Sequence, residues 1–161
     1  MTEVGSQTSD VGIQVRPFEA AHLAALEVQP AQRAELAVGA AGAVELEGDY
    51  ARSVFWAGRL VACAGVQPIW AGRGFAWALI GRGFPAAGWL AFSRAARDML
   101  DAAQAAGFTR LETTVALDFP AGIGWVRLLG FECEGLMRQW LGGRDHLLYA
   151  RIRAAALEAA A

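Results

Sequence analysis

The residues best placed to bind a ligand lie in the loop 81–88, which joins a short apolar run to a long amphipathic segment. The loop reads Gly-Arg-Gly-Phe-Pro-Ala-Ala-Gly, so small residues flank Arg82. Backbone amides at the start of a helix attract anions, and an arginine beside them adds positive charge. Pro85, in contrast, has no N–H group to donate. The loop therefore predicts an anion site at a helix N-terminus, with a turn that only reverses the chain as the alternative.

Few other side chains carry obvious chemistry. The chain contains no lysine, which excludes a lysine nucleophile or a Schiff base. Its two cysteines, Cys63 and Cys133, are predicted to be buried free thiols in a reducing compartment, with a disulfide or a nucleophilic cysteine as alternatives. His22 and His146 have no ligand-like spacing with cysteine or aspartate, so we predict no metal site.

Composition and charge predict one soluble, intracellular domain. The 161 residues are 55% hydrophobic, which is enough for a sizeable core. A net charge of −2 argues against binding to nucleic acid or to an anionic membrane surface. No apolar run reaches the roughly 18 residues that a membrane-spanning helix needs, and no signal peptide is recognisable. We expect a flexible lead at 1–10, a single domain at 11–153 and an alanine-rich tail at 154–161.

A strand–helix–strand unit must position the loop. Residues 75–80 are apolar throughout, which is typical of a central strand covered on both faces. Residues 89–107 then show a helical period, and 109–116 alternates as the next strand. The helix turns one apolar set toward the core: Trp89, Phe92, Ala96, Met99, Ala103 and Ala106. The opposite face, expected to meet water, carries Arg94, Arg97, Asp98, Asp101 and Gln104.

The rest of the chain adds elements on either side of this unit. We predict strands at 12–18, 50–57, 60–67, 132–141 and 146–152, and helices at 19–27, 31–38 and 121–129. The hairpin turns at Gly58-Arg59, and 68–74 is a connector. Together these elements predict an α/β fold, with a mixed sheet of six to seven strands and about four flanking helices.

Two further groups of residues have predicted places in this fold. Asp118 is expected to cap the last helix. Three tryptophans are expected in the core: Trp77, Trp89 and Trp125. Trp70, in the connector before the central strand, is expected near a cleft for an acceptor substrate.

This order of elements resembles the GNAT superfamily of acetyl-CoA-dependent N-acetyltransferases over about residues 12–152. The most specific piece is the segment TRLETTVALDFPAGIGWVRLLGFECEG, in which a strand, a short helix and Leu-Gly-Phe follow one another. It is similar to the "V…N…A…Y-x-x-x-GF" segment of that family. The form Trp-Val-Arg-Leu-Leu-Gly-Phe looks more like the phage-encoded branch, whose members are described as acetyltransferases or as internal virion proteins.

The resemblance implies where acetyl-CoA binds. In this family the strands matching 75–80 and 109–116 diverge, and the cofactor enters between them. Its pantetheine would then follow Leu79 and Ile80, and its pyrophosphate would lie on the loop. The loop positions carried over are Arg82, Gly83 and Gly88, with Asp118 standing where the family often has asparagine. Phe84 and Pro85 depart from the small residues usual in this loop.

The resemblance is weaker on the catalytic side. Glu112 is the candidate general base, and Val126 occupies the place of the usual tyrosine acid. The implied function is transfer of an acetyl group to a small-molecule or protein amine, in the cytoplasm and without a metal. One alternative is a catalytically silent GNAT-fold component of a phage virion, with virion or assembly partners. Another, a sensor or toxin-type transferase, is not separated from the enzyme by sequence.

Overall fold

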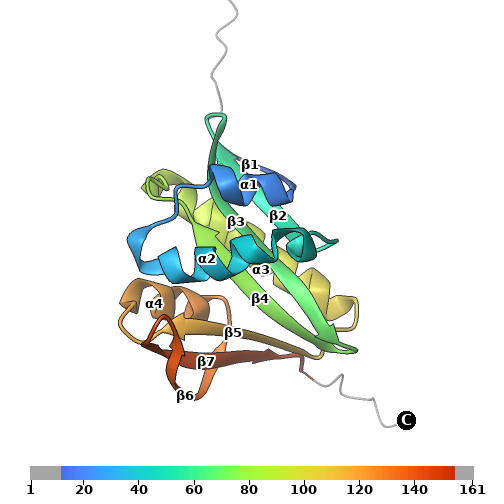
Figure 1. Cartoon of the computed structure of the whole chain (residues 1–161). Coiled ribbons are helices and arrows are strands. Elements are labelled where there is room, and N and C mark those ends of the chain that lie inside the picture. Colours follow the sequence, from blue (N-terminus) through green and yellow to red (C-terminus); the bar gives the residue numbers. More distant parts are fainter. Residues whose placement is uncertain (1–11, 155–161) are drawn as a thin grey trace, which may run out of the picture.

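The computed structural model describes residues 12–154, so the predicted lead and nearly all of the tail lie outside the described residues. One seven-stranded sheet in the order β1-β2-β3-β4-β5-β7-β6 runs through this part (Figure 1). Its strands are β1 (Ile13–Pro17), β2 (Ala51–Trp56), β3 (Arg59–Trp70), β4 (Arg73–Ile80), β5 (Arg110–Ala116), β6 (Glu132–Leu141) and β7 (Arg144–Ile152). Only β4 and β5 pair in parallel, which confirms the predicted mixed sheet.

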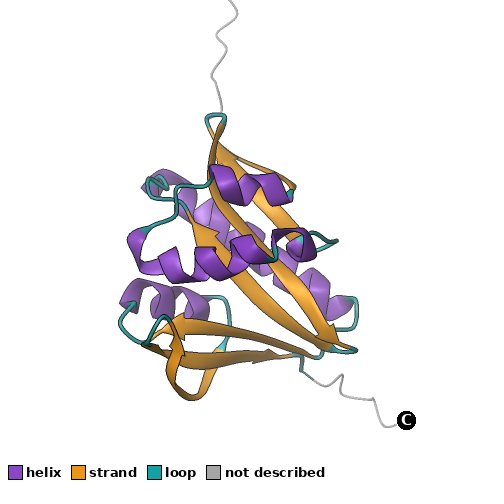
Figure 2. Cartoon of the chain, viewed as in Figure 1, coloured by secondary structure: helices purple, strands orange, loops and turns teal. Residues whose placement is uncertain are grey.

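Helices cover both faces of the sheet (Figure 2). They are α1 (Ala20–Ala25), α2 (Arg33–Ala41), α3 (Trp89–Ala105) and α4 (Pro120–Leu128), with 3-10 helices η1 (Pro30–Gln32), η2 (Ala43–Leu46) and η3 (Ala86–Gly88). The α1 and α2 face buries one core cluster that includes Leu23 and Leu79. The α3 and α4 face buries another that includes Leu100 and Val126. The predicted fold class and the expected four helices are thus confirmed within the described residues.

The hairpins before the central strand differ in detail from the prediction. The β2–β3 turn is Ala57-Gly58, one residue earlier than expected, because both residues take the positive φ of a tight hairpin turn. The predicted connector 68–74 is wrong. β3 continues to Trp70 and β4 begins at Arg73, because Gly72 with φ +80° closes a second tight turn.

Trp70 therefore lies at the end of a strand. It borders a small pocket together with Glu112, and its place near an acceptor cleft stays a prediction. It is 62% exposed, and the Arg73 guanidinium lies 4.1 Å above its ring. Trp77, Trp89 and Trp125 are half-buried and pack against the core clusters, close to the expected core positions.

The long helix α3 follows the predicted pattern over most of its length. Phe92, Ala96 and Ala103 are buried as expected. Gln104, predicted to meet water, is buried because its amide bonds Arg151. Ala106, predicted in the core, is exposed because the helix ends one residue before it.

The last third of the chain contains one wrong local interpretation. Asp118 does not cap α4; the N-cap position is Phe119, which makes no side-chain hydrogen bond. Arg144 instead donates to the Asp118 carboxylate at 2.5 Å and lowers its pKa. A partner 26 positions away has thus replaced the local cap.

Candidate functional site: a gap between two parallel strands

The parallel strands β4 and β5 are hydrogen-bonded at one end only. The ladder joins Arg73, Gly74 and Phe75 to Arg110, Leu111 and Glu112, and then stops. Both strands continue, since β4 stays paired with β3 to Ile80 and β5 with β7 to Ala116. The strands therefore diverge, as the resemblance implied. We call the paired part the closed end, and the space between residues 76–80 and 113–116 the gap.

Strand parity shows which backbone groups border the gap. Gly81 N–H donates to Val61 C=O, so alternate residues of β4 face β3. Ala76, Ala78 and Ile80 consequently turn their N–H and C=O groups away from β3. The Ala76 N–H closes the last pair of the ladder on Glu112 C=O, and the other groups face the gap. The same reasoning from the bond between Leu117 N–H and Asp145 C=O places the backbone groups of Thr114 and Ala116 on the opposite side.

Part of this free edge of β4 is occupied by the segment that leads into α2. The Gln32 amide donates to Ala78 C=O at 2.8 Å, and its oxygen accepts from Ile80 N–H at 2.9 Å. The side chain thus imitates a neighbouring strand. Gln29 N–H also donates to Ile80 C=O at 2.9 Å. The Ala76 C=O and the Ala78 N–H still face the gap.

A cavity of about 1020 Å³ extends through the gap. Both strands contribute to its wall, together with α2, the start of α3, α4 and β6. Among the residues implied to bind the cofactor, it touches Leu79, Ile80, Arg82 and Gly83. The structure thus brings four of the six predicted cofactor residues to one cavity.

The loop offers a mixed set of groups to an anion. The amides of Gly81, Arg82, Phe84 and Gly88 are already bonded to carbonyl groups of the chain. Gly88 is buried, and a Cβ there would lie 3.0 Å from the Trp56 ring, so its lack of a side chain serves packing. Gly83 is exposed, and a Cβ there would meet only the Arg59 guanidinium, at 3.7 Å. The sequence reasoning missed Arg59 because it lies on the preceding hairpin.

An aromatic cluster borders the gap on the α3 and α4 face. It consists of Phe84, Trp89, Phe92 and Trp125, with successive ring centroids 5.1 to 5.6 Å apart. Trp125 also donates to the Ser93 hydroxyl at 3.0 Å, which ties α4 to α3. Phe84, which departs from the family pattern, is therefore folded inward against its own helix.

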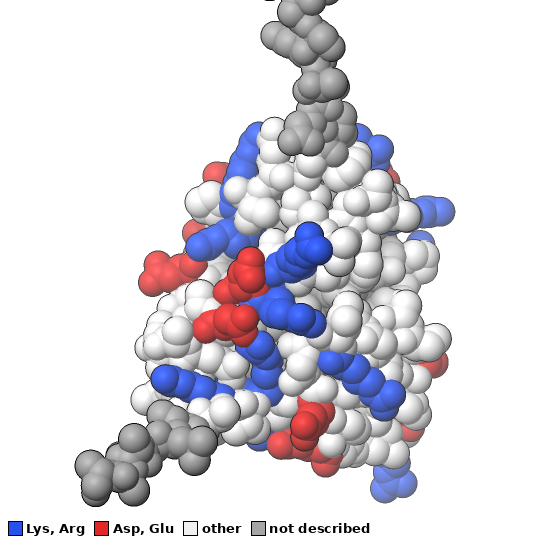
Figure 3. All heavy atoms as spheres, turned by 180° about the vertical axis from the view of Figure 1, so that it is seen from behind, with Lys and Arg blue, Asp and Glu red and all other residues white. Residues whose placement is uncertain are grey.

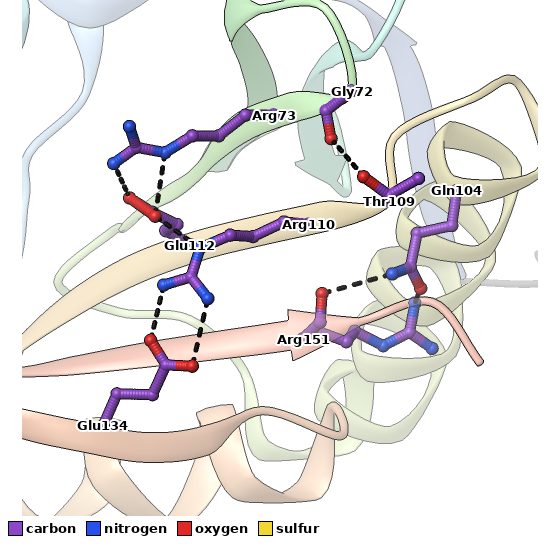
Figure 4. Close-up of polar contacts among 8 residues, drawn as sticks. All are labelled: Gly72, Arg73, Gln104, Thr109, Arg110, Glu112, Glu134 and Arg151. Carbon is purple, nitrogen blue, oxygen red and sulfur yellow. Dashed lines mark hydrogen bonds and ion pairs between the residues drawn. The ribbon is translucent and has the colours of Figure 1, made fainter. Parts of the chain in front are cut away.

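The predicted base Glu112 lies at the closed end and does not border the cavity. Arg73 binds both of its carboxylate oxygens, at 2.9 and 2.5 Å, and Arg110 adds a bond of 2.7 Å (Figure 4). Arg110 also bonds Glu134. The hydrogen bonds from Arg73 and then Arg110 lower the pKa of Glu112. Its role as a general base stays a prediction, and one that these ion pairs weaken, because a carboxylate with a lowered pKa accepts a proton less readily.

A second acid–base pair, missed by the sequence reasoning, lies at the other end of the strands. Glu35 on α2 borders the cavity, and its carboxylate is 3.3 Å from His146 Nε2 on β7. The two residues are 111 positions apart, so no spacing in the sequence points to them.

The two cysteines lie in different surroundings. Cys63 is buried beside Ser53, and burial raises its pKa to about 11, so it is not a reactive thiolate. The prediction that Cys133 is buried is wrong, because both faces of the edge strand β6 are largely exposed there.

No helix of the described part is long and apolar enough to span a membrane, and these residues hold no cluster of three possible metal ligands. Arginines and acidic side chains are interspersed on the face shown in Figure 3.

Comparisons with solved structures identify the fold. No family model matches the chain, and no curated protein matches its sequence. The ribosomal-protein-S18-alanine N-acetyltransferase from Escherichia coli matches with a TM-score of 0.66 at 19% identity, over 91% of this chain and 97% of that one. A ribosomal L7/L12 alpha-N-protein acetyltransferase in complex with coenzyme A matches with a TM-score of 0.64 at 20% identity, over 90% and 96%.

An acetyltransferase of the GNAT family from Bacillus anthracis also matches, with a TM-score of 0.65 at 14% identity, over 88% of this chain and 95% of that one. At these identities the likeness establishes the fold. The chain has the fold of the GNAT-family N-acetyltransferases.

Proposed function

We propose that this chain is an N-acetyltransferase that binds acetyl-CoA in the gap between β4 and β5 and transfers the acetyl group to an amine. One observation carries the proposal: the β4–β5 ladder stops after three residue pairs, while both strands continue beside a cavity of about 1020 Å³. A strand edge without a neighbouring strand offers N–H and C=O groups to an extended ligand that contains amides.

The residues present fit such a ligand along most of its length. The Ala76 C=O and the Ala78 N–H would bind the amide-containing arm, and the apolar walls would cover it. The phosphates would lie by Arg82, Arg59 and the amide of Gly83, in place of a full ring of loop amides. When bound, acetyl-CoA supplies an acyl group activated as a thioester. The roles of Gly88 and Asp118 in binding it stay predictions, because neither borders the cavity.

The acceptor is an amine on a small molecule or a protein, and the expected location is the cytoplasm. The two ribosomal acetyltransferases named above act on ribosomal proteins according to their names, and such acceptors lie within this class. A silent virion component is the opposite hypothesis, in which the gap binds no CoA, whereas membership of the phage branch fits either hypothesis. Two features of the loop favour the silent component: Phe84 of the aromatic cluster replaces a small residue, and Pro85 has no N–H group.

Binding of acetyl-CoA tests the proposal directly. At about 100 times its dissociation constant, a ligand of the folded state adds roughly 2.7 kcal/mol to the free energy of unfolding, which a thermal shift detects. We expect that shift with acetyl-CoA and with CoA. Unchanged melting at millimolar concentration of both would favour the silent component.

Three variants locate the site. Arg82→Ala and Arg59→Ala should each weaken binding, and Gly83→Asp should weaken it more, because the carboxylate fits the space and would pair with Arg59. Arg94→Ala, on the exposed face of α3, is the matched control and should bind normally. Equal binding by all four variants would remove the loop from the site.

A further inference from the structure

The pair formed by Glu35 and His146 has a defined arrangement of protons. His146 is fully buried, and its Nδ1 lies 3.1 Å from the Arg144 carbonyl oxygen. A carbonyl oxygen only accepts, so Nδ1 carries a hydrogen. The contact of Nε2 with Glu35 Oε1 at 3.3 Å then needs one more proton, held either by the imidazole or by the carboxyl group. The ring is thereby fixed with Nε2 toward Glu35.

The second carboxylate oxygen of Glu35 is left for another partner. Glu35 Oε2 is buried and has no hydrogen-bond partner within the described residues, although the side chain borders the cavity. A buried carboxylate oxygen without a donor is costly, and such atoms in folded proteins usually meet a ligand or water. Because the Glu35 side chain borders the cavity, a donor group bound in the cavity is the partner that this oxygen lacks.

The elements around the pair place it across the gap. Gln32, three residues before Glu35, holds the free edge of β4, and His146 lies opposite Ala116 at the end of β5. Arg144 also donates to Ala31 C=O at 2.8 Å, which fastens the start of α2 to β7. The segment Pro30–Ala41 thus bridges the two diverging strands (Figure 1), and Glu35 in this segment borders the cavity.

Resting on the function proposed above, we propose that Glu35 binds the acceptor amine and takes its proton, and that His146 is the positioning residue that holds the carboxylate. The bound ammonium group first gives one proton to Glu35 Oε2. The neutral amine nitrogen then forms its bond to the acyl carbon, the carbon–sulfur bond breaks, and the nitrogen gives a second proton to the departing thiolate. The acceptor is a primary amine, which a carboxylate attracts in its cationic form.

Two carboxylates of the described residues line the cavity, Glu35 and Glu45, and Glu45 is exposed and has no buried oxygen without a partner. Arg144 is paired with Asp118, and Asp145 accepts from the Gln139 backbone amide. Asp118 is exposed and does not border the cavity.

The test separates binding of the amine from transfer. The protein has two histidines, so the ring nitrogen signals of His146 can be followed by NMR. Adding n-butylamine at millimolar concentration, without acetyl-CoA, should move these signals in the wild-type protein and not in Glu35→Gln. Glu27→Gln removes an exposed carboxylate before η1 and should respond like the wild type. Unmoved His146 signals in the wild-type protein would overturn the inference, whether or not acetyl-CoA binds.

Kinetics give the second readout. Glu35→Gln should lower the rate of transfer to n-butylamine by about a hundredfold or more while acetyl-CoA still shifts the melting temperature as in the wild type. His146→Gln should lower kcat less and leave KM for acetyl-CoA unchanged. A Glu35→Gln protein that transfers at the wild-type rate would overturn the role of Glu35. Failure of the wild type to bind acetyl-CoA would instead overturn the proposed function, since the amine titration does not depend on it.

Discussion

The two ends of the β4–β5 junction satisfy the hydrogen bonds of the strand edges in opposite ways. At the closed end three backbone pairs join the strands, and Glu112 lies between Arg73 and Arg110 above them (Figure 4). At the gap the ladder is absent. The side chain of Gln32 binds the β4 edge there, and Glu35 reaches His146 beside β5.

The difference shows where this chain places its charged groups. At the closed end the Glu112 carboxylate accepts hydrogen bonds from two guanidinium groups, on both of its oxygens. At the gap one carboxylate oxygen of Glu35 has no partner among the described residues. We therefore expect variants of the closed end to change stability, and variants of the gap to change ligand binding as well.

The largest effect is expected from Glu112→Gln at the closed end. The Glu112 side chain is 8% exposed, and its loss would leave two guanidinium groups without their shared partner. Removing one member of a buried ion pair typically costs about 3 kcal/mol. Urea unfolding should show a loss of this size. The matched control is Glu134→Gln, the exposed end of the same network, which should cost less than about 1 kcal/mol.

The same variant predicts a change in acid sensitivity. The hydrogen bonds from Arg73 and Arg110 lower the pKa of Glu112 from its ordinary 4.5, so the unfolded chain binds this proton more readily than the folded one. Its contribution is full above the unfolded pKa and is lost as the pH falls through the folded pKa. The wild type should lose stability below about pH 5 more steeply than Glu112→Gln. Parallel curves would show that the ion pairs contribute nothing.

At the gap, Gln32→Leu should cost about 2 kcal/mol, because Ala78 C=O and Ile80 N–H lose their partner together. Gln14→Leu, on the exposed edge strand β1, serves as the control and should be close to neutral. Denaturant unfolding measures both. If Gln32→Leu leaves the free energy of unfolding unchanged, water replaces the side-chain amide, and the Gln32 bonds to the edge of β4 do not stabilise the fold.

The fold could be predicted from the sequence, but the polar contacts at the gap could not. The helical period of 89–107 and the apolar run 75–80 are local signals, and they predicted the strand–helix–strand unit correctly. Gln32 pairs with backbone groups 46 and 48 positions away, which leave no trace in its own neighbourhood. Asp118 failed for the same reason, since the local pattern predicted a cap and a distant arginine decided its role. Long-range polar contacts depend on the finished fold, and the local periodicity of a sequence does not encode them.

On the α3 and α4 face, Ser93→Ala should cost about 1 kcal/mol or slightly less. The Trp125 indole N–H would lose its acceptor at 3.0 Å, while alanine gains a few tenths of a kcal/mol in helix propensity. Thermal unfolding followed by tryptophan fluorescence measures the result. If Ser93→Ala is more stable than the wild type, propensity outweighs the hydrogen bond, and the aromatic cluster alone holds α4 against α3.

The smallest effect, and the one with the opposite sign, is expected from Tyr149→Phe. Tyr149 is fully buried on β7 opposite Thr113, the first residue of β5 beyond the closed end. Its hydroxyl has no hydrogen-bond partner within the described residues, so removing it should stabilise the fold by up to about 1 kcal/mol. Tyr50→Phe, at a half-buried tyrosine on the same core cluster, should change little. A loss of stability in Tyr149→Phe would show that the hydroxyl is hydrated. Water would then reach the point where the strands part, and the boundary between the closed end and the gap would be less dry than its packing indicates.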